Sequence, residues 1–195
     1  MSNLVLDSPW AGSLLWMALY ISDYYFTIAC ARLYRGQDKI VFEGSYEITP
    51  IFQADVNALR LVSPRFWLIL IASTGYVFFV RWYTGQSTEL RYLYVTVLGA
   101  MILTEAAVHM RHLRNWFLYK RAVPLIQGRI EYPRGALLRM SAFEMLAFSV
   151  LYSALYLVTE SMFLLGGGIA CFALSIKHYR LAGRHDAALF KKGKL

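Results

Sequence analysis

Five apolar runs, each long enough to cross a lipid bilayer, restrict the fold of this chain more than any other feature. In a window of about 19 residues they lie near 10–31, 66–83, 92–110, 142–159 and 161–177. The chain is 58% apolar and 16% charged, whereas soluble domains average roughly 45–50% and about 25%. The sequence therefore predicts an all-α integral membrane protein, a single membrane domain of five transmembrane helices.

The last two runs are nearly continuous from Ser141 to Ile176. One helix of that length would extend roughly 54 Å at about 1.5 Å per residue, whereas the hydrocarbon core is roughly 30 Å thick. The segment 159–161, Thr-Glu-Ser, is the polar cluster inside this run. Because such a cluster is costly at the bilayer centre, we expect the chain to turn there and form a helical hairpin.

The Lys and Arg residues are distributed very unevenly among the segments that these spans define. The connection 32–65 contains five, the connection 111–141 contains seven, and the segment from Lys177 onward contains six. The other three segments contain two in total. Five spans place 18 of the 20 cations on one face, so the positive-inside rule predicts a multi-pass cell-membrane protein with its N-terminus outside and its C-terminus in the cytoplasm.

This distribution also accounts for the net charge of +8. In a soluble protein such a charge favours nucleic acid as a partner. Beside a bilayer the same residues contact anionic lipid headgroups, each contributing about 1 kcal/mol. We therefore expect membrane lipids as partners on the cytoplasmic side, and no nucleic acid.

The connection 32–65 contains a predicted amphipathic helix. Thr49 is suited to cap a helix whose first residue is Pro50, and Ser63-Pro64 ends it. Its apolar face consists of Phe52, Val56, Leu59 and Val62. We expect this helix to lie at the inner membrane interface. It either packs on the membrane surface or, with Glu43 and Glu47 as gate candidates, covers a site that opens to the cytoplasm.

The connection 111–141 begins as a helical continuation of the third span and breaks at Pro124, Gly128 and 132–135. Its cations either remain solvated and serve only to set the membrane orientation, or they bind the phosphate group of a lipid or a soluble anion. The candidates for such a contact are Arg111, Arg114 and Arg121. After the fifth span, a basic cytoplasmic tail is expected over 178–195.

Three carboxylates interrupt the apolar spans, where a charge costs about 2.5–3.5 kcal/mol. Asp23, Glu105 and Glu144 each lie about 20 Å from the outer end of their span, which places them in one layer. His109 and His112 follow Glu105 by four and seven residues, so the three share one helix face. This is the most specific constellation in the sequence.

Three kinds of function are compatible with these residues. In a small transporter-like or channel-like protein, Asp23, Glu105, His109 and Glu144 line a proton or cation route. In an inner-leaflet enzyme acting on a lipid or phosphate-bearing substrate, Glu105, His109 and His112 bind a divalent metal such as Zn, Fe or Mn. In a non-catalytic accessory subunit, the carboxylates are paired internally.

Two further features concern packing. The segment 166–168, Gly-Gly-Gly, gives the fifth span a small-residue face, which favours close helix contacts within the protein or between subunits. We therefore expect a homo-oligomer or a membrane partner. Cys30 and Cys171 differ in depth by roughly 15 Å, which is too far for a disulfide, so both are expected to be free and buried.

Two segments in the first quarter of the chain resemble small uncharacterised prokaryotic multi-span membrane proteins. Asp23-Tyr-Tyr-Phe-Thr27 is similar to their Asp-x-x-x-Thr pattern, and Glu47-Ile-Thr49-Pro50, within the segment that begins at Glu43, is similar to their Glu-x-Asn-Pro pattern. Thr49 replaces the Asn. No activity is established for such families, so the resemblance implies a multi-span membrane fold and no mechanism.

The predicted topology is testable with reporter fusions after Leu195. Green fluorescent protein at this position should fluoresce, because it folds in the cytoplasm, and alkaline phosphatase should be inactive there because the C-terminus is not translocated. The same reporters fused before Met1 serve as the control and should give the opposite pattern. Active phosphatase at the C-terminus would contradict the orientation.

Overall fold

The computed structural model describes residues 8–85, 87 and 90–191, and it is 81% helical. Within this described part, five helices are long and apolar enough to cross a membrane. The prediction of an all-α fold with five spans is therefore confirmed. The five helices are α2 (Pro9–Arg35), α4 (Pro64–Thr84), α5 (Arg91–Phe117), α6 (Arg134–Thr159) and α7 (Met162–Lys191).

Short elements occupy the two long connections. The α2–α4 connection contains β1 (Ile40–Phe42) and α3 (Pro50–Asn57). The α5–α6 connection contains a π-helical turn, η1 (Leu118–Ala122), a 3-10 turn, η2 (Val123–Leu125), and β2 (Ile130–Tyr132). β1 and β2 pair in parallel, with Ile40 opposite Ile130. We call the end of the bundle that carries this sheet and the last turns of α7 the basic end.

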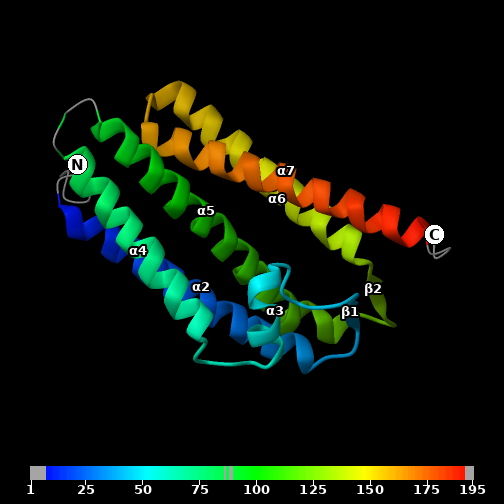
Figure 1. The fold of residues 1–195 in the computed structure, drawn as a ribbon. Coiled ribbons are helices and arrows are strands. Elements are labelled where there is room, and N and C mark those ends of the chain that lie inside the picture. The colour runs from blue at the N-terminus through cyan, green and yellow to red at the C-terminus, as the bar shows by residue number, and fades with distance from the viewer. Residues whose placement is uncertain (1–7, 86, 88–89, 192–195) are drawn as a thin grey trace.

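Helix α5 lies between two helix pairs (Figure 1). On one side α2 packs against both α4 and α5, and on the other side α7 packs against both α5 and α6. The α6–α7 pair is antiparallel and follows the length of α5 (Figure 1). Because both pairs pack against α5, this helix lines the space between them.

The helix ends follow from local capping residues. The Ser8 hydroxyl accepts hydrogen bonds from the main-chain nitrogens of Trp10 and Ala11 at the start of α2, and the Ser63 hydroxyl accepts one from that of Phe66 in α4. Helix α6 ends at Thr159, and Glu160 adopts a left-handed φ of 55° before α7 begins. The predicted hairpin break at 159–161 is confirmed.

Helix α3 begins at Pro50, as predicted, but it is shorter than predicted. It ends at Asn57, and Leu59 takes a left-handed φ of 50°. Val62, which was predicted to continue the apolar face, lies outside the helix and is 67% exposed. The position of α3 at a membrane interface stays a prediction.

A hydrogen bond and an ion pair to one buried carboxylate join α3 to the start of α4. The Asp55 carboxylate is 3% exposed and accepts a hydrogen bond from the Ser63 hydroxyl at 2.6 Å. Arg60 pairs with the same carboxylate at 3.1 Å. A buried carboxylate is costly unless it is paired, so these contacts fix the turn between the two helices.

Several helices extend past the predicted spans toward the basic end. Residues 134–141, expected to belong to a connection, begin α6, and residues 178–191, expected to form a tail, continue α7. The side chains of Arg139 and Asp186 pair, and the Ser141 hydroxyl lies 2.9 Å from Nδ1 of His178. These contacts hold the extension of α7 against α6. Residues 192–195 of the predicted tail lie outside the described residues.

The two cysteines are buried and free, as predicted. The Cys30 thiol donates to the main-chain carbonyl of His112 at 3.4 Å, between α2 and α5. Cys171 packs with Ala107 and Met145, where α5, α6 and α7 meet. Both residues therefore contribute to helix packing.

The contact between α5 and α7 depends on glycine. A Cβ atom at Gly99 would overlap the main-chain carbonyl of Phe163, and one at Gly166 would overlap that of Thr96. The two main chains therefore approach more closely than a side chain would allow. The small-residue face of α7 is used for packing inside the chain, so it is not free to contact a second copy.

This packing predicts that Gly166→Ala destabilises the protein. The added methyl group forces α5 and α7 apart, and such overpacking costs about 1–3 kcal/mol, or roughly 3–10 °C in Tm. Gly75→Ala in α4 is the matched control, because a Cβ atom there meets nothing within 4 Å. Thermal unfolding in detergent should show the Tm of the control unchanged or slightly raised. Equal effects of the two substitutions would contradict the close contact.

Candidate functional site

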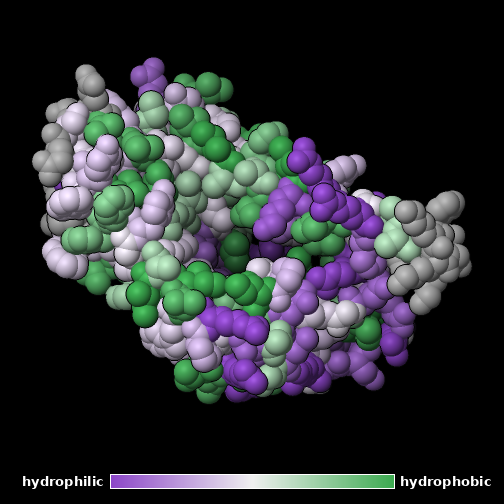
Figure 2. Space-filling model, in the orientation of Figure 1, coloured by the Kyte–Doolittle hydropathy of each residue, from purple (hydrophilic) through white to green (hydrophobic). Residues whose placement is uncertain are grey.

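A cavity of about 530 Å³ lies between the two helix pairs. Its walls come from α2, α3, α5, α6, α7 and the β1–α3 connection. The hollow is visible on the side of the bundle, over α5 and between α3 and the α6–α7 pair, and hydrophilic residues gather between it and the basic end (Figure 2). All three carboxylates that interrupt the spans, Asp23, Glu105 and Glu144, line this cavity.

The packing of α2 against α5 brings Asp23, Glu105 and His109 together. One ligand atom from each residue lies within 4.8 Å of the others. Nδ1 of His109 lies 2.7 Å from the main-chain carbonyl of Glu105. Because a carbonyl only accepts, Nδ1 carries the proton, and in the neutral ring Nε2 is the nitrogen that accepts. Histidines that bind metals through Nε2 are commonly oriented in this way.

A cation that binds Nε2 must displace the Ser22 hydroxyl, and this hydroxyl has a second acceptor. The Ser22 hydroxyl lies 2.7 Å from Nε2 of His109 and 2.8 Å from the main-chain carbonyl of Leu19. When the hydroxyl donates to the carbonyl, its proton remains satisfied without His109. When a cation binds Nε2, the Ser22 hydroxyl therefore still has an acceptor for its proton.

Glu105 carries an incompletely satisfied atom. Its Oε2 atom is buried and has no hydrogen-bond partner among the residues described, and the buried Oδ1 atom of Asp23 has there only its ion-pair contact with His112. Buried polar atoms almost always have a partner. In addition, two carboxylates this close repel one another unless a proton or a cation lies between them. The cluster is therefore suited to hold a proton or a metal ion.

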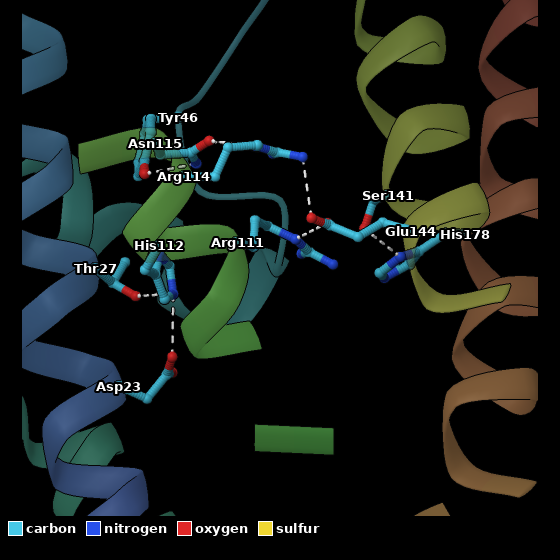
Figure 3. Close-up of polar contacts among 10 residues, drawn as sticks. All are labelled: Asp23, Thr27, Tyr46, Arg111, His112, Arg114, Asn115, Ser141, Glu144 and His178. Carbon is cyan, nitrogen blue, oxygen red and sulfur yellow. Dashed lines mark hydrogen bonds and ion pairs between the residues drawn. The ribbon is translucent and has the colours of Figure 1, made fainter. Parts of the chain in front are cut away.

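His112 lies beside Asp23 and Thr27 instead of joining Glu105 and His109 in the cluster (Figure 3). Its Nε2 atom is 3.0 Å from Oδ1 of Asp23 and 3.0 Å from the Thr27 hydroxyl. The side chain is nearly fully buried between α2 and α5. The structure thus brings Glu105 and His109 together as predicted, with Asp23 in the place predicted for His112. His112 orients the Asp23 carboxylate.

Glu144 faces the cavity from the opposite wall, where two arginines of α5 bind it (Figure 3). Nε of Arg111 donates to Oε2 of Glu144 at 2.6 Å, and Nη1 of Arg114 donates to Oε1 at 3.0 Å. Its charge is therefore balanced on its own wall, and Glu144 is not part of the Asp23–Glu105 group. Arg121 is exposed in η1 and is not among the residues that line the cavity.

The β1–α3 connection covers the cavity toward the basic end. Glu43 is exposed and accepts a hydrogen bond from the main-chain nitrogen of Arg134 at 3.0 Å, so the connection is joined to the first turn of α6. Glu47 lines the cavity, and its Oε1 atom accepts from the main-chain nitrogen of Thr49 at 2.6 Å. Burial raises the pKa of Glu47, the hydrogen bond from Thr49 opposes this, and the nearby Asp23 adds to the increase.

Several residues of the site carried no interpretable signal in the sequence. Ser22 is a single hydroxyl on an apolar helix, and Lys177 and His178, which line the cavity from α7, were assigned to the tail or its edge. Thr27 follows Asp23 by four residues, so helical spacing places both on one face. Asp23, Thr27 and Glu47 lie in the two segments that resemble other multi-span membrane proteins, and all three line the cavity.

Comparison with protein-family models, with curated proteins and with solved structures finds no match. The function of the cavity must therefore follow from its own side chains. Two carboxylates and an imidazole converge on the α2–α5 side, and two arginines face them from the α5–α6 side. The first group is suited to a cation and the second to an anion.

Proposed function

We propose that the protein is a metal-dependent enzyme of the inner membrane leaflet, which acts on a lipid or another phosphate-bearing substrate. Asp23, Glu105 and His109 hold one divalent ion. The observation that carries this proposal is the convergence of three donor atoms within 4.8 Å, together with the buried and unpartnered Oε2 atom of Glu105.

The donor set fits a first-row transition metal. Imidazole favours Zn and Fe, and carboxylate favours Mn, so the mixed set suits these three ions. An ion about 2.1 Å from each donor keeps the donors within about 4.2 Å of one another, which small side-chain rotations achieve. Three protein ligands leave a coordination position free, as in catalytic sites. When bound, such an ion polarises a phosphoryl oxygen and makes a bound water more nucleophilic.

The location of the cavity supports an enzyme more than a conduit. The 18-to-2 distribution of cations favours a cytoplasmic basic end, and the β1–α3 connection at this end covers the cavity. At the other end, the α5–α7 contact at Gly99 and Gly166 leaves no room even for a methyl group. A chemical step inside the cavity needs no path to that end of the bundle, whereas conduction does.

The accessory-subunit alternative requires that the carboxylates be paired internally. Glu144 meets this requirement through Arg111 and Arg114. Asp23 meets it only in part, through His112. Glu105 does not meet it among the residues described, because Oε2 lacks a partner. This alternative therefore receives less support.

The metal proposal predicts about one equivalent of Zn, Fe or Mn per chain in the purified protein, measured by elemental analysis. Asp23→Asn and Glu105→Gln should each weaken metal affinity at least about tenfold, because each removes an anionic ligand. Glu131→Gln is the matched control, since Glu131 is an exposed carboxylate paired only with Arg129, and it should retain the full metal content. No stoichiometric metal in the wild-type protein would refute the proposal.

A proton or cation route is the second candidate function, and one contact favours it. The 3.0 Å contact between His112 and Asp23 extends the titratable groups from Glu105 toward the basic end, and Glu47 lines the same cavity. Such a row allows protons to pass between neighbouring groups. A transporter of this kind must also provide a path to the opposite end of the bundle.

This second candidate predicts proton or cation flux into liposomes that contain the wild-type protein, above that of protein-free liposomes. Glu105→Gln should abolish the flux, because the amide does not ionise, and Glu131→Gln should leave it unchanged. A pH-sensitive dye or a cation-sensitive dye inside the liposomes gives the measurement. Equal flux for wild type and Glu105→Gln would exclude the route.

A further inference from the structure

Figure 3 shows Asp23 on one side of the cavity and Arg111 and Arg114, bound to Glu144, on the other. Asp23 and Glu105 form the anionic wall on the α2–α5 side. Arg111 and Arg114 point across to α6, and Lys177 lines the same region from α7. A ligand that contacts both walls must therefore bear an anionic group near the arginines. The cation proposed at Asp23 and Glu105 then faces this anionic group from the opposite wall.

The arginine wall has an unused donor. Nη2 of Arg111 is buried and has no hydrogen-bond partner among the residues that the structure describes. Only Nε of Arg111 and Nη1 of Arg114 are used by Glu144. A carboxylate has two oxygens, whereas a terminal phosphate offers three, and arginine pairs bind such groups through parallel hydrogen bonds. Phosphate in place of Glu144 therefore satisfies the donor that Glu144 leaves free.

The shape of the cavity indicates where the rest of the ligand lies. The β1–α3 connection lines the cavity toward the basic end and is joined to α6 through Glu43 and Arg134. An opening of the cavity lies on the side of the bundle, between α3 and the α6–α7 pair (Figure 2). In a bilayer, such an opening gives lipid molecules access to the cavity.

Part of the cavity lining is apolar. Phe52 of α3 and Leu137 and Met140 of α6 line the cavity, and Met140 is 48% exposed. These side chains suit an alkyl chain, whereas Arg111 and Arg114 suit its headgroup. A volume of about 530 Å³ lies within the range of small-ligand pockets, so it accommodates a headgroup while the tail stays in the bilayer.

We propose that the cavity binds an amphiphile with a terminal phosphate from the bilayer, whose phosphate displaces Glu144 from Arg111 and Arg114 while its tail leaves through the side opening. This inference rests on the proposed function, because it assigns the substrate class to the same cavity. Glu144 then acts as an internal competitor that occupies the anion site when the amphiphile is absent.

The test uses the full-length protein in neutral detergent, with binding followed by native mass spectrometry. The probes are dioctanoyl phosphatidic acid, dioctanoyl phosphatidylcholine and inorganic phosphate. Phosphatidic acid should bind more tightly than both, because it alone combines a terminal phosphate with a tail. Equal binding of phosphatidylcholine would overturn the phosphate site, and equal binding of inorganic phosphate would overturn the amphiphile.

Variants separate the two roles on the arginine wall. Glu144→Gln should raise affinity for phosphatidic acid roughly three- to tenfold, because it removes the competing charge. Arg111→Gln should lower it at least about tenfold, and Arg114→Gln, on a more exposed side chain, tests the same site if Arg111→Gln does not fold. Arg129→Gln and Glu131→Gln, on an exposed ion pair, are the matched controls and should change nothing.

The metal content of each variant distinguishes this inference from the proposed function. Arg111→Gln and Glu144→Gln should retain the metal content of wild type, because neither residue belongs to the Asp23–Glu105–His109 cluster. If wild type binds metal but Arg111→Gln binds phosphatidic acid as tightly as Arg129→Gln does, the amphiphile site is wrong and the metal proposal stands. If wild type holds no metal but phosphatidic acid binding depends on Arg111, the metal proposal is wrong and the amphiphile site stands.

Discussion

The close approach of α5 and α7 is the contact on which the rest of the structure depends. The main chains meet at Gly99 and Gly166, where no Cβ atom fits, and α5 is also the helix against which α2 packs. Because the two helix pairs share this one helix, the contact sets their separation at one end of the bundle. Toward the other end they enclose the cavity, so tight packing and open space are consequences of the same arrangement.

The polar groups in the cavity form two separate sets. On one wall Glu144 is bound by two arginines, and on the other Asp23 contacts His112. Within this second set Glu105 retains an unpartnered buried oxygen. Buried charges are stable only when paired, so the imbalance at Glu105 is the feature that distinguishes a binding site from a purely structural network.

The sequence predicted those features that depend on the bilayer. Apolar run length determined the spans, and the cost of a polar cluster in hydrocarbon located the turn at Glu160. Helical spacing alone joined Glu105 to His109 on α5. Which residue of another helix completes the group depends on helix rotation and packing, which span lengths do not determine. For this reason Asp23 and Glu144 were predicted at one level, whereas the structure places Glu144 with Arg111.

The short elements were missed for a different reason. β1 and β2 have three residues each and pair across 90 positions of sequence, and strands this short have no periodic pattern of their own. Their pairing has a mechanical consequence. Helix α5 is joined to α7 by the glycine contacts at one end, and the connections that follow α2 and α5 are joined by this sheet at the other. Any motion that widened the cavity by separating the two helix pairs at one end would therefore have to break one of these two contacts.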